Sequence, residues 1–309
     1  MIKGFYCFVI LYTLWIGFSY LFLNTSYFFQ LNGFYLDLSI YFSVIFFVLI
    51  ASIKTAIFMI YENSFLEKTP TLRFIYILLS LAIWIGIFLF VRITGNKSDN
   101  LFIIGSANLV VFSILCGTWL ASAIKRPAEL VPVCVIMALA DLLSVAKGPT
   151  KEIVEAVENY YKSGMLEITP FGDFLLVKIA SLGFDRILPV FGVSDWIIVS
   201  FLSATAFKFR MDDNIGRKSL KYMNENKRLF FYFPITAFYL AFTVILAQSL
   251  HFPIPALLII APCFLVFILI RYPESRRLNK KEWNLLFLFS SIMLAIFFIR
   301  LLFLQRNAL

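Results

Sequence analysis

Two aspartates stand out in this sequence because each lies inside a long hydrophobic run. Asp141 lies in the run ALADLLSVA, and Asp195 lies in the run GVSDWIIVS. A carboxylate is too short to reach the headgroups from within a membrane helix, and burying it there costs several kcal/mol. Acidic residues at such positions face a water-filled cavity or the interior of a helix bundle, and they mark functional sites.

The spacing of the two aspartates predicts that they lie at one depth. Asp141 is about five residues before the one long connection of the chain, and Asp195 is about seven residues after it. At about 1.5 Å per residue, each then lies roughly 8–12 Å below the same membrane face. The two helices run antiparallel, so the carboxyl groups can meet.

Two carboxyl groups in contact suit a specific chemistry. They share a proton, because both cannot ionise side by side in a poor dielectric. The ionised group can activate a water as general base, and the protonated group can polarise a carbonyl, as in aspartic proteases. The pair alone also fits two unrelated polar residues at helix interfaces, or a proton relay in a transporter.

The composition predicts that these aspartates belong to a polytopic α-helical membrane protein. Of 309 residues, 61% are hydrophobic and 15% are charged, against about 25% charged in soluble domains. The formal charge of +9 is interpreted as loop charge that sets orientation, so no nucleic-acid partner is expected. The four cysteines lie in apolar blocks without metal-ligand spacing, which predicts neither a disulfide framework nor a metal site or cofactor.

Apolar runs of about 20 residues predict nine spans. These cover roughly 4–24, 36–61, 71–93, 101–124, 128–146, 188–207, 229–250, 253–271 and 285–304. We expect a four-helix N-terminal part over 1–127 and a second part over 128–309 that carries both aspartates. Lys54 and Arg300 lie near span ends, where they can snorkel to the headgroups.

The connection 147–187 has structure of its own. Its first part, KEIVEAVENYY, predicts an amphipathic surface helix. Two apolar stretches, MLEIT and FLLVKIA, flank a Pro170–Asp173 turn and predict a β-hairpin over 165–180, although FLLVKIA could equally extend the next helix. Connections 208–228 and 271–281 are rich in Lys and Arg, which predicts a cytoplasmic N-terminus and places 147–187 on the outer face.

Three segments together resemble the presenilin and signal peptide peptidase family. ALADLLSVAKGPTKEIVEAVE is similar to the segment of the first catalytic aspartate, with Asp141 in its place and Lys147-Gly148-Pro149 following. FGVSDWIIVSFLSATAF is similar to the Gly-x-Gly-Asp segment, in which Gly192 and Asp195 match. The third motif is Pro255-Ala256-Leu257. The resemblance covers about 128–265, and the earlier spans match only as hydrophobic helices.

The resemblance implies a presenilin-like bundle and an intramembrane aspartyl endopeptidase without a cofactor. Its catalytic residues would be Asp141 and Asp195, and its substrates would be transmembrane segments or remnant signal peptides. Substrate contacts would come from Gly192, Ser194 and the Pro-Ala-Leu segment; accessory subunits are left open. With a cytoplasmic N-terminus, the orientation would resemble that of signal peptide peptidase rather than that of presenilin.

Two positions depart from the family pattern. Ala140 stands in place of a Tyr, and Ser194 stands in place of the second Gly. They motivate the alternative of a catalytically inactive relative that binds membrane proteins. A proton-coupled transporter is a further alternative, but it requires repeated halves, and the sequence has no internal repeat.

Overall fold

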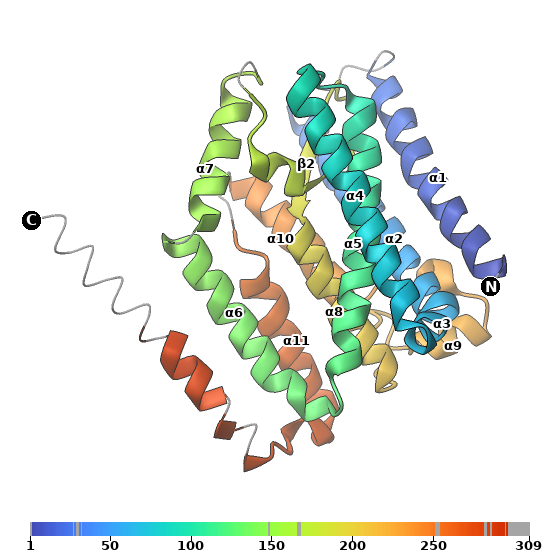
Figure 1. The fold of residues 1–309 in the computed structure, drawn as a ribbon, viewed down its shortest axis with the longest axis vertical. Helices are drawn as coiled ribbons and strands as arrows, with labels where there is room; N and C mark the ends of the chain where they lie inside the picture. Colours follow the sequence, from blue (N-terminus) through green and yellow to red (C-terminus); the bar gives the residue numbers. More distant parts are fainter. Residues whose placement is uncertain are drawn as a thin grey trace, which may run out of the picture.

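The protein is a bundle of long helices, with a small β-hairpin at one end (Figure 1). The computed structural model describes residues 2–26, 28, 31, 33–147, 149–165, 168–250, 254–280, 283–284, 286–293 and 295. In the first part of the chain, the helices are α1 (Ile2–Thr25), α2 (Phe34–Ile57), a π-helix η1 (Phe58–Glu62), α3 (Asn63–Lys68), α4 (Pro70–Thr94) and α5 (Asp99–Ala123).

The second part of the chain holds the two aspartates and the hairpin. After the short η2 (Pro127–Glu129) come α6 (Leu130–Lys147), α7 (Pro149–Lys162), η3 (Phe171–Leu175), β1 (Leu176–Ala180) and β2 (Ile187–Gly192). The remaining elements are α8 (Val193–Lys208), α9 (Leu220–Glu225), η4 (Leu229–Phe231), α10 (Ile235–Leu250), α11 (Leu257–Arg271) and η5 (Pro273–Arg276).

Helix α5 forms the centre of the bundle because small residues let a second helix approach it closely. A Cβ atom on Gly117 would lie 2.5 Å from the Ile197 carbonyl oxygen and 2.7 Å from the Ser200 Cβ, both on α8. On the same face of α5, the Ser113 hydroxyl donates a hydrogen bond to the carbonyl oxygen of Val193. The start of α8, and therefore Asp195, is positioned by this contact with α5.

Several helices are long and apolar enough to cross a membrane, which supports a membrane-embedded protein. By length and composition, four described segments qualify: Phe34–Tyr61, Pro70–Thr94, Asp99–Ala123 and Pro127–Ser144. Helices α10 and α11 are apolar but shorter. Helix α4 lies at the outside of the bundle and exposes apolar side chains, among them Ile75, Leu79 and Leu89, which a lipid environment would cover.

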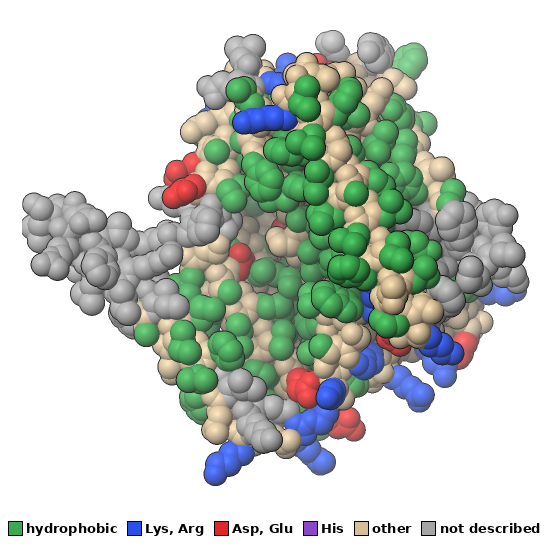
Figure 2. Space-filling view, viewed as in Figure 1, with side chains coloured by type: hydrophobic (Ala, Val, Ile, Leu, Met, Phe, Trp, Pro, Cys, Tyr) green, Lys and Arg blue, Asp and Glu red, His purple; other side chains and the backbone are tan. Residues whose placement is uncertain are grey.

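The surface separates apolar from charged side chains. Figure 2 shows hydrophobic side chains over the middle of the bundle and most of the visible Lys and Arg at its lower end. That end holds the connection from α8 to α10 and the segment after α11 (Figure 1). This distribution is typical of a helix bundle whose middle part contacts lipid.

The predicted boundaries need three corrections. The hairpin exists, but its antiparallel strands are Leu176–Ala180 and Ile187–Gly192, and Phe171–Leu175 is a 3₁₀ turn instead of the hairpin turn. FLLVKIA therefore pairs with residues that the sequence had assigned to the sixth span, and that helix begins at Val193. Helices α10 and α11 are also shorter than predicted at their starts. Most of the predicted ninth span lies outside the described residues.

The snorkelling prediction for Lys54 is wrong. Its side chain is only 2% exposed, and its ammonium nitrogen lies 5.4 Å from the ring centres of Tyr12 and Trp15. Among the described residues, neither the Lys54 nitrogen nor the Trp15 indole nitrogen has a hydrogen-bond partner. The lysine points into the bundle because α1 covers its side of α2. Arg300 lies outside the described residues.

Candidate active site

Asp141 contacts the Pro-Ala-Leu segment directly. It lies on α6, six residues before the helix ends, and its Oδ2 accepts a hydrogen bond from the Leu257 amide at 3.1 Å. The amide of Leu258 also interacts with this carboxyl. These are the first two residues of α11, where helix amides lack intrahelical acceptors. The carboxylate therefore caps α11 from a neighbouring helix, across 116 positions of sequence.

The Leu257 and Leu258 amides can bind this carboxyl because α10 ends before the Pro-Ala-Leu segment and α11 begins within it. Helix α10 ends at Leu250, and α11 begins at Leu257 with Ala256 as its N-cap residue. Pro255 removes one backbone donor and disfavours a helical residue before it. Pro255, Ala256 and Leu257 are partly buried. Pro253 and His251 lie outside the described part of the chain.

Asp195 lies closer to the start of its helix than the sequence predicted. It is the third residue of α8, and its Oδ2 accepts a hydrogen bond from the Gly192 amide at 2.8 Å. Strand β2 ends at Gly192, so the strand delivers the chain directly to the aspartate. A Cβ on Gly192 would lie 3.3 Å from this carboxyl oxygen, a tight contact that favours a glycine here.

The two neighbours of Asp195 differ in environment. Ser194 is exposed, as a residue would be if it bordered an open site. Trp196 is fully buried and packs against Phe191 of β2, with ring centres 5.6 Å apart. Asp195 itself is partly buried between them.

The two aspartates are brought near each other, but not by direct packing of their helices. Helix α6 packs chiefly against α11, and α8 packs chiefly against α5. The carboxyl groups of Asp141 and Asp195 are close enough to interact electrostatically, and no hydrogen bond joins them in the described structure. The predicted antiparallel contact between α6 and α8 is thus replaced by a space that α11 borders.

This space is visible on the surface. Figure 2 shows a hollow between α6 and the rest of the bundle, with an acidic side chain at its bottom. Figure 1 shows the Pro-Ala-Leu end of α11 and the start of α8 on the same side of α6. An extended peptide placed there would lie beside the two carboxyl groups.

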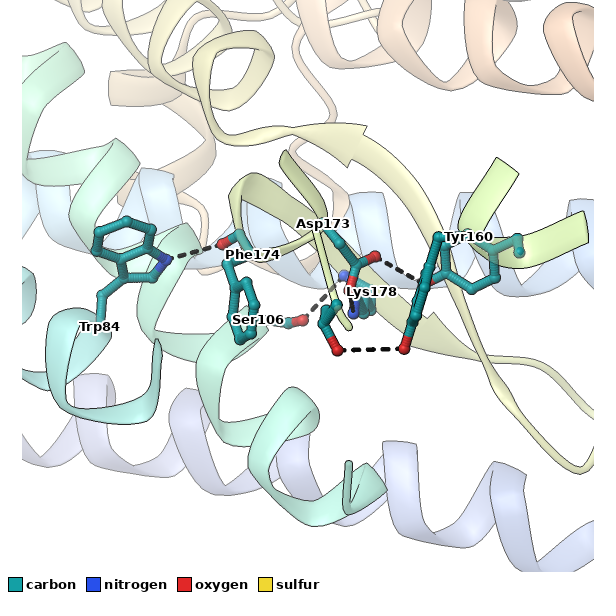
Figure 3. Close-up of polar contacts among 8 residues, drawn as sticks. Trp84, Ser106, Tyr160, Asp173, Phe174 and Lys178 are labelled. Carbon is teal, nitrogen blue, oxygen red and sulfur yellow. Dashed lines mark hydrogen bonds and ion pairs between the residues drawn. The ribbon is translucent and has the colours of Figure 1, made fainter. Parts of the chain in front are cut away.

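A buried ion pair that sequence reasoning missed supports the hairpin. The Lys178 ammonium lies 2.5 Å from Asp173 Oδ2, and the side chains are 4% and 0% exposed. The Tyr161 hydroxyl of α7 donates to the other carboxylate oxygen at 2.8 Å. Figure 3 shows this cluster between α7 and the hairpin. The one available signal was a lysine within the apolar stretch FLLVKIA.

The ionisation of this cluster follows from its burial. Burial lowers the pKa of Lys178, and the adjacent Asp173 carboxylate opposes that effect. Burial, followed by the charge of Asp173, raises the pKa of Tyr161. Tyr161 therefore stays protonated and donates its hydrogen bond at neutral pH, and α7 is held to the carboxylate of η3.

Two further hydrogen bonds attach the hairpin to α4 and α5. The Trp84 indole donates to the Phe174 carbonyl oxygen at 2.8 Å, and the Ser106 hydroxyl accepts from the Lys178 amide at 2.9 Å (Figure 3). Because β1 pairs with β2 up to Gly192, these contacts also set the position at which α8 begins. The cluster is therefore a support for the Asp195 side of the candidate site.

Cys116, Cys134 and Cys263 are free thiols. No group of three or more His, Cys, Asp or Glu side chains that could hold a metal ion occurs among the described residues. Gly148 lies outside them. Comparison of the chain with protein-family models, curated proteins and solved structures finds no match.

Proposed function

We propose that this protein is an intramembrane aspartyl endopeptidase. The observation that carries the proposal is the hydrogen bond from the Leu257 amide to Asp141. It joins two of the three segments that resemble the presenilin and signal peptide peptidase family, and the third, with Asp195, borders the same space. A pair of carboxyl groups in a partly buried hollow can activate a water molecule, with one group as base and the other as acid.

The reaction would use the two carboxyls as a coupled pair. One carboxylate takes a proton from a water molecule as the water attacks the scissile carbonyl carbon, and the protonated partner donates a hydrogen bond to the carbonyl oxygen. Because the two carboxyls titrate as a coupled pair, the roles of general base and proton donor belong to the pair and not to either residue alone. Collapse of the tetrahedral intermediate transfers a proton to the leaving amine and restores the pair.

The substrate would be a transmembrane segment that unwinds locally. A helix hides its peptide bonds within its own hydrogen bonds, so the cleaved stretch must become extended. Strand β2 has β1 on one edge and ends three residues before Asp195. No strand of the described residues pairs with its other edge, and a substrate strand would be added there. The Pro-Ala-Leu segment would border the substrate on the Asp141 side.

The proposed setting is a multi-pass membrane protein with nine spans and a presenilin-like bundle. The N-terminus would be cytoplasmic, and the connection 147–187 would lie on the outer face. Support comes from the lysines and arginines of connections 208–228 and 271–281, which lie at one end of the bundle. The hairpin and α7 lie at the other end (Figure 1).

The test is cleavage of a transmembrane reporter by the purified protein in liposomes. Asp141→Asn and Asp195→Asn keep an oxygen that accepts the amide hydrogen bonds, but they remove the acid and base. We expect each change to lower the cleavage rate by roughly 10²–10⁴-fold. Asp185→Asn changes an exposed acid on the turn of the same hairpin and should cleave as wild type does. Full cleavage by both site variants contradicts the proposal.

A second candidate function is the binding of membrane proteins without cleavage. This function is favoured because both carboxyl groups already accept backbone hydrogen bonds. Asp141 accepts from the Leu257 amide at the start of α11, and Asp195 accepts from the Gly192 amide. In that case wild type binds but does not cleave. Asp→Ala at either position should then lower stability more than Asp→Asn does, and binding should survive both Asn changes.

A further inference from the structure

A basic cavity lies at the end of the bundle opposite the hairpin. Its volume is about 390 Å³, and it is formed where α8 ends, beside α9 and the π-helix η1. The polar lining residues are Lys208, Arg210, Ser219, Lys221 and Asn224. The other lining residues are apolar, such as Ile60, and none of the described lining residues is acidic.

Two of the three cations are available to a ligand. The Lys208 ammonium already donates to carbonyl oxygens at the end of α5, the shortest contact being 2.6 Å to Ile124. Lys221 lies 3.9 Å from Glu225 in a solvent-exposed pair, which contributes little. Arg210 is exposed, and no described carboxylate pairs with it. Arg210 and Lys221 can therefore bind an anion without first losing a strong partner.

The backbone around the cavity departs from ordinary helix geometry in two places. Arg210 has φ 56°, a left-handed conformation that is unfavourable for a residue with a side chain. The wall formed by Ile60 belongs to η1, and such π-helical turns occur frequently at functional sites. Both departures border the same cavity, which favours a binding role for it.

The surroundings of the cavity suit a membrane interface. In the connection between α8 and α10, the side chains of Phe230 and Phe231 are 67% and 75% exposed, and Ile215 and Tyr222 are also exposed. The connection from Lys208 to Arg228 contains seven Lys and Arg residues. Exposed aromatic rings beside clustered cations are typical of segments that contact anionic lipid headgroups.

We propose that this cavity binds the phosphate headgroup of an anionic phospholipid. Arg210 and Lys221 contact the phosphate, and Ser219 and Asn224 provide hydrogen-bonding groups for the rest of the headgroup. The apolar wall contacts the glycerol and the first acyl carbons. A lipid fits better than a soluble phosphate compound because apolar residues complete the lining and the exposed rings beside it place the cavity at the bilayer surface. The site is independent of the aspartate pair.

The test measures lipid binding to the purified full-length protein in detergent by native mass spectrometry. Dioleoyl phosphatidylglycerol is compared with dioleoyl phosphatidylcholine. The double variant Arg210→Gln/Lys221→Gln is compared with Arg217→Gln/Lys227→Gln, a control in the same connection with the same loss of charge. Arg217 also shares the backbone conformation of Arg210, with φ 55°, and neither control residue lines the cavity.

We expect wild type and the control variant to bind the anionic lipid in preference to the neutral one. The cavity variant should bind it about 30-fold more weakly, which is about five-fold for each cation removed. If both variants bind the anionic lipid equally weakly, the attraction comes from net charge and not from a site, and the proposal is overturned. It is also overturned if wild type shows no preference for the anionic lipid. Competition by glycerol 3-phosphate at equal concentration would overturn the lipid assignment in favour of a soluble phosphate ligand.

Discussion

At the residue scale, the same residue type has opposite surroundings at two buried positions. Lys178 is buried with the Asp173 carboxylate 2.5 Å away, whereas Lys54 is buried between the rings of Tyr12 and Trp15. A buried charge costs several kcal/mol unless it is paired. Two desolvated cation–π contacts return about 2 kcal/mol each, which offsets only part of that cost.

This difference predicts opposite effects of one substitution. Lys178→Met leaves the Asp173 carboxylate buried without its partner, and it should lower the free energy of unfolding by about 3–5 kcal/mol. Lys54→Met has a similar volume and removes a charge that no described carboxylate pairs with, so it should raise stability by about 1–4 kcal/mol. Thermal unfolding of the purified variants in detergent measures both. A loss of stability in Lys54→Met would indicate an anionic partner for that lysine.

The candidate site also depends on contacts that single residues make with distant backbone. Asp141 and Asp195 were identifiable from the sequence because a carboxylate in a hydrophobic run is costly. Their hydrogen-bond partners could not be identified from the sequence. Asp141 accepts from the Leu257 amide and Asp195 from the Gly192 amide, and such pairings depend on the relative placement of distant segments. Nor does the sequence show Asp173 and Lys178 as an internal ion pair.

At the element scale, the position of α8 depends on a close approach to α5. Gly117 faces the α8 backbone, and an added Cβ would lie 2.5 Å from a carbonyl oxygen that cannot move without moving the helix. Gly86 on α4 has nothing within 4 Å of an added Cβ. The close approach of α8 thus requires a glycine at position 117, and no comparable contact exists at Gly86.

We predict that Gly117→Ala lowers stability by about 1–3 kcal/mol, because it overpacks the α5–α8 interface. Gly86→Ala should be neutral or stabilise by up to about 1 kcal/mol, because Ala has the higher helix propensity. Thermal unfolding compares the two, and the cleavage assay should show an additional loss only for Gly117→Ala, since α8 carries Asp195. Equal effects of the two substitutions would contradict the role of Gly117.

The hairpin shows where local patterns were insufficient at this scale. Apolar stretches around Pro170–Asp173 predicted strands on both sides of that turn. The actual partner of Leu176–Ala180 is Ile187–Gly192. A run such as ILPVFG is apolar enough for either a buried strand or a helix start, and the choice is made by pairing with β1.

At the scale of the whole molecule, charge separates the two ends of the bundle. The connection after α8 is strongly basic, whereas 147–187 contains acids that offset its lysines and arginines. Cytoplasmic connections of membrane proteins carry the excess of Lys and Arg. The proposed orientation rests on this difference and not on the chemistry of the aspartates, so it can be tested separately.

The orientation predicts which cysteines an impermeant thiol reagent reaches in intact cells. In a variant without the four native cysteines, Asp185→Cys on the hairpin turn should react from outside. Arg217→Cys, between α8 and α9, should react only after the membrane is permeabilised. Both residues are exposed, so a failure to react reflects the side of the membrane. The reverse pattern would mean that the bundle is inverted.

The sequence by itself determined the class of protein, most of the helices and the two aspartates. These follow from hydrophobic run length and from the cost of a charge within such a run, which are local properties. Only the tertiary structure decided that α11 rather than α8 packs on α6, that Asp141 caps the Pro-Ala-Leu helix, and that Lys54 points inward. Those outcomes depend on which helix faces fit closely together, as at Gly117. The sequence could not decide them because several helix–helix contacts are compatible with the same local hydrophobic pattern.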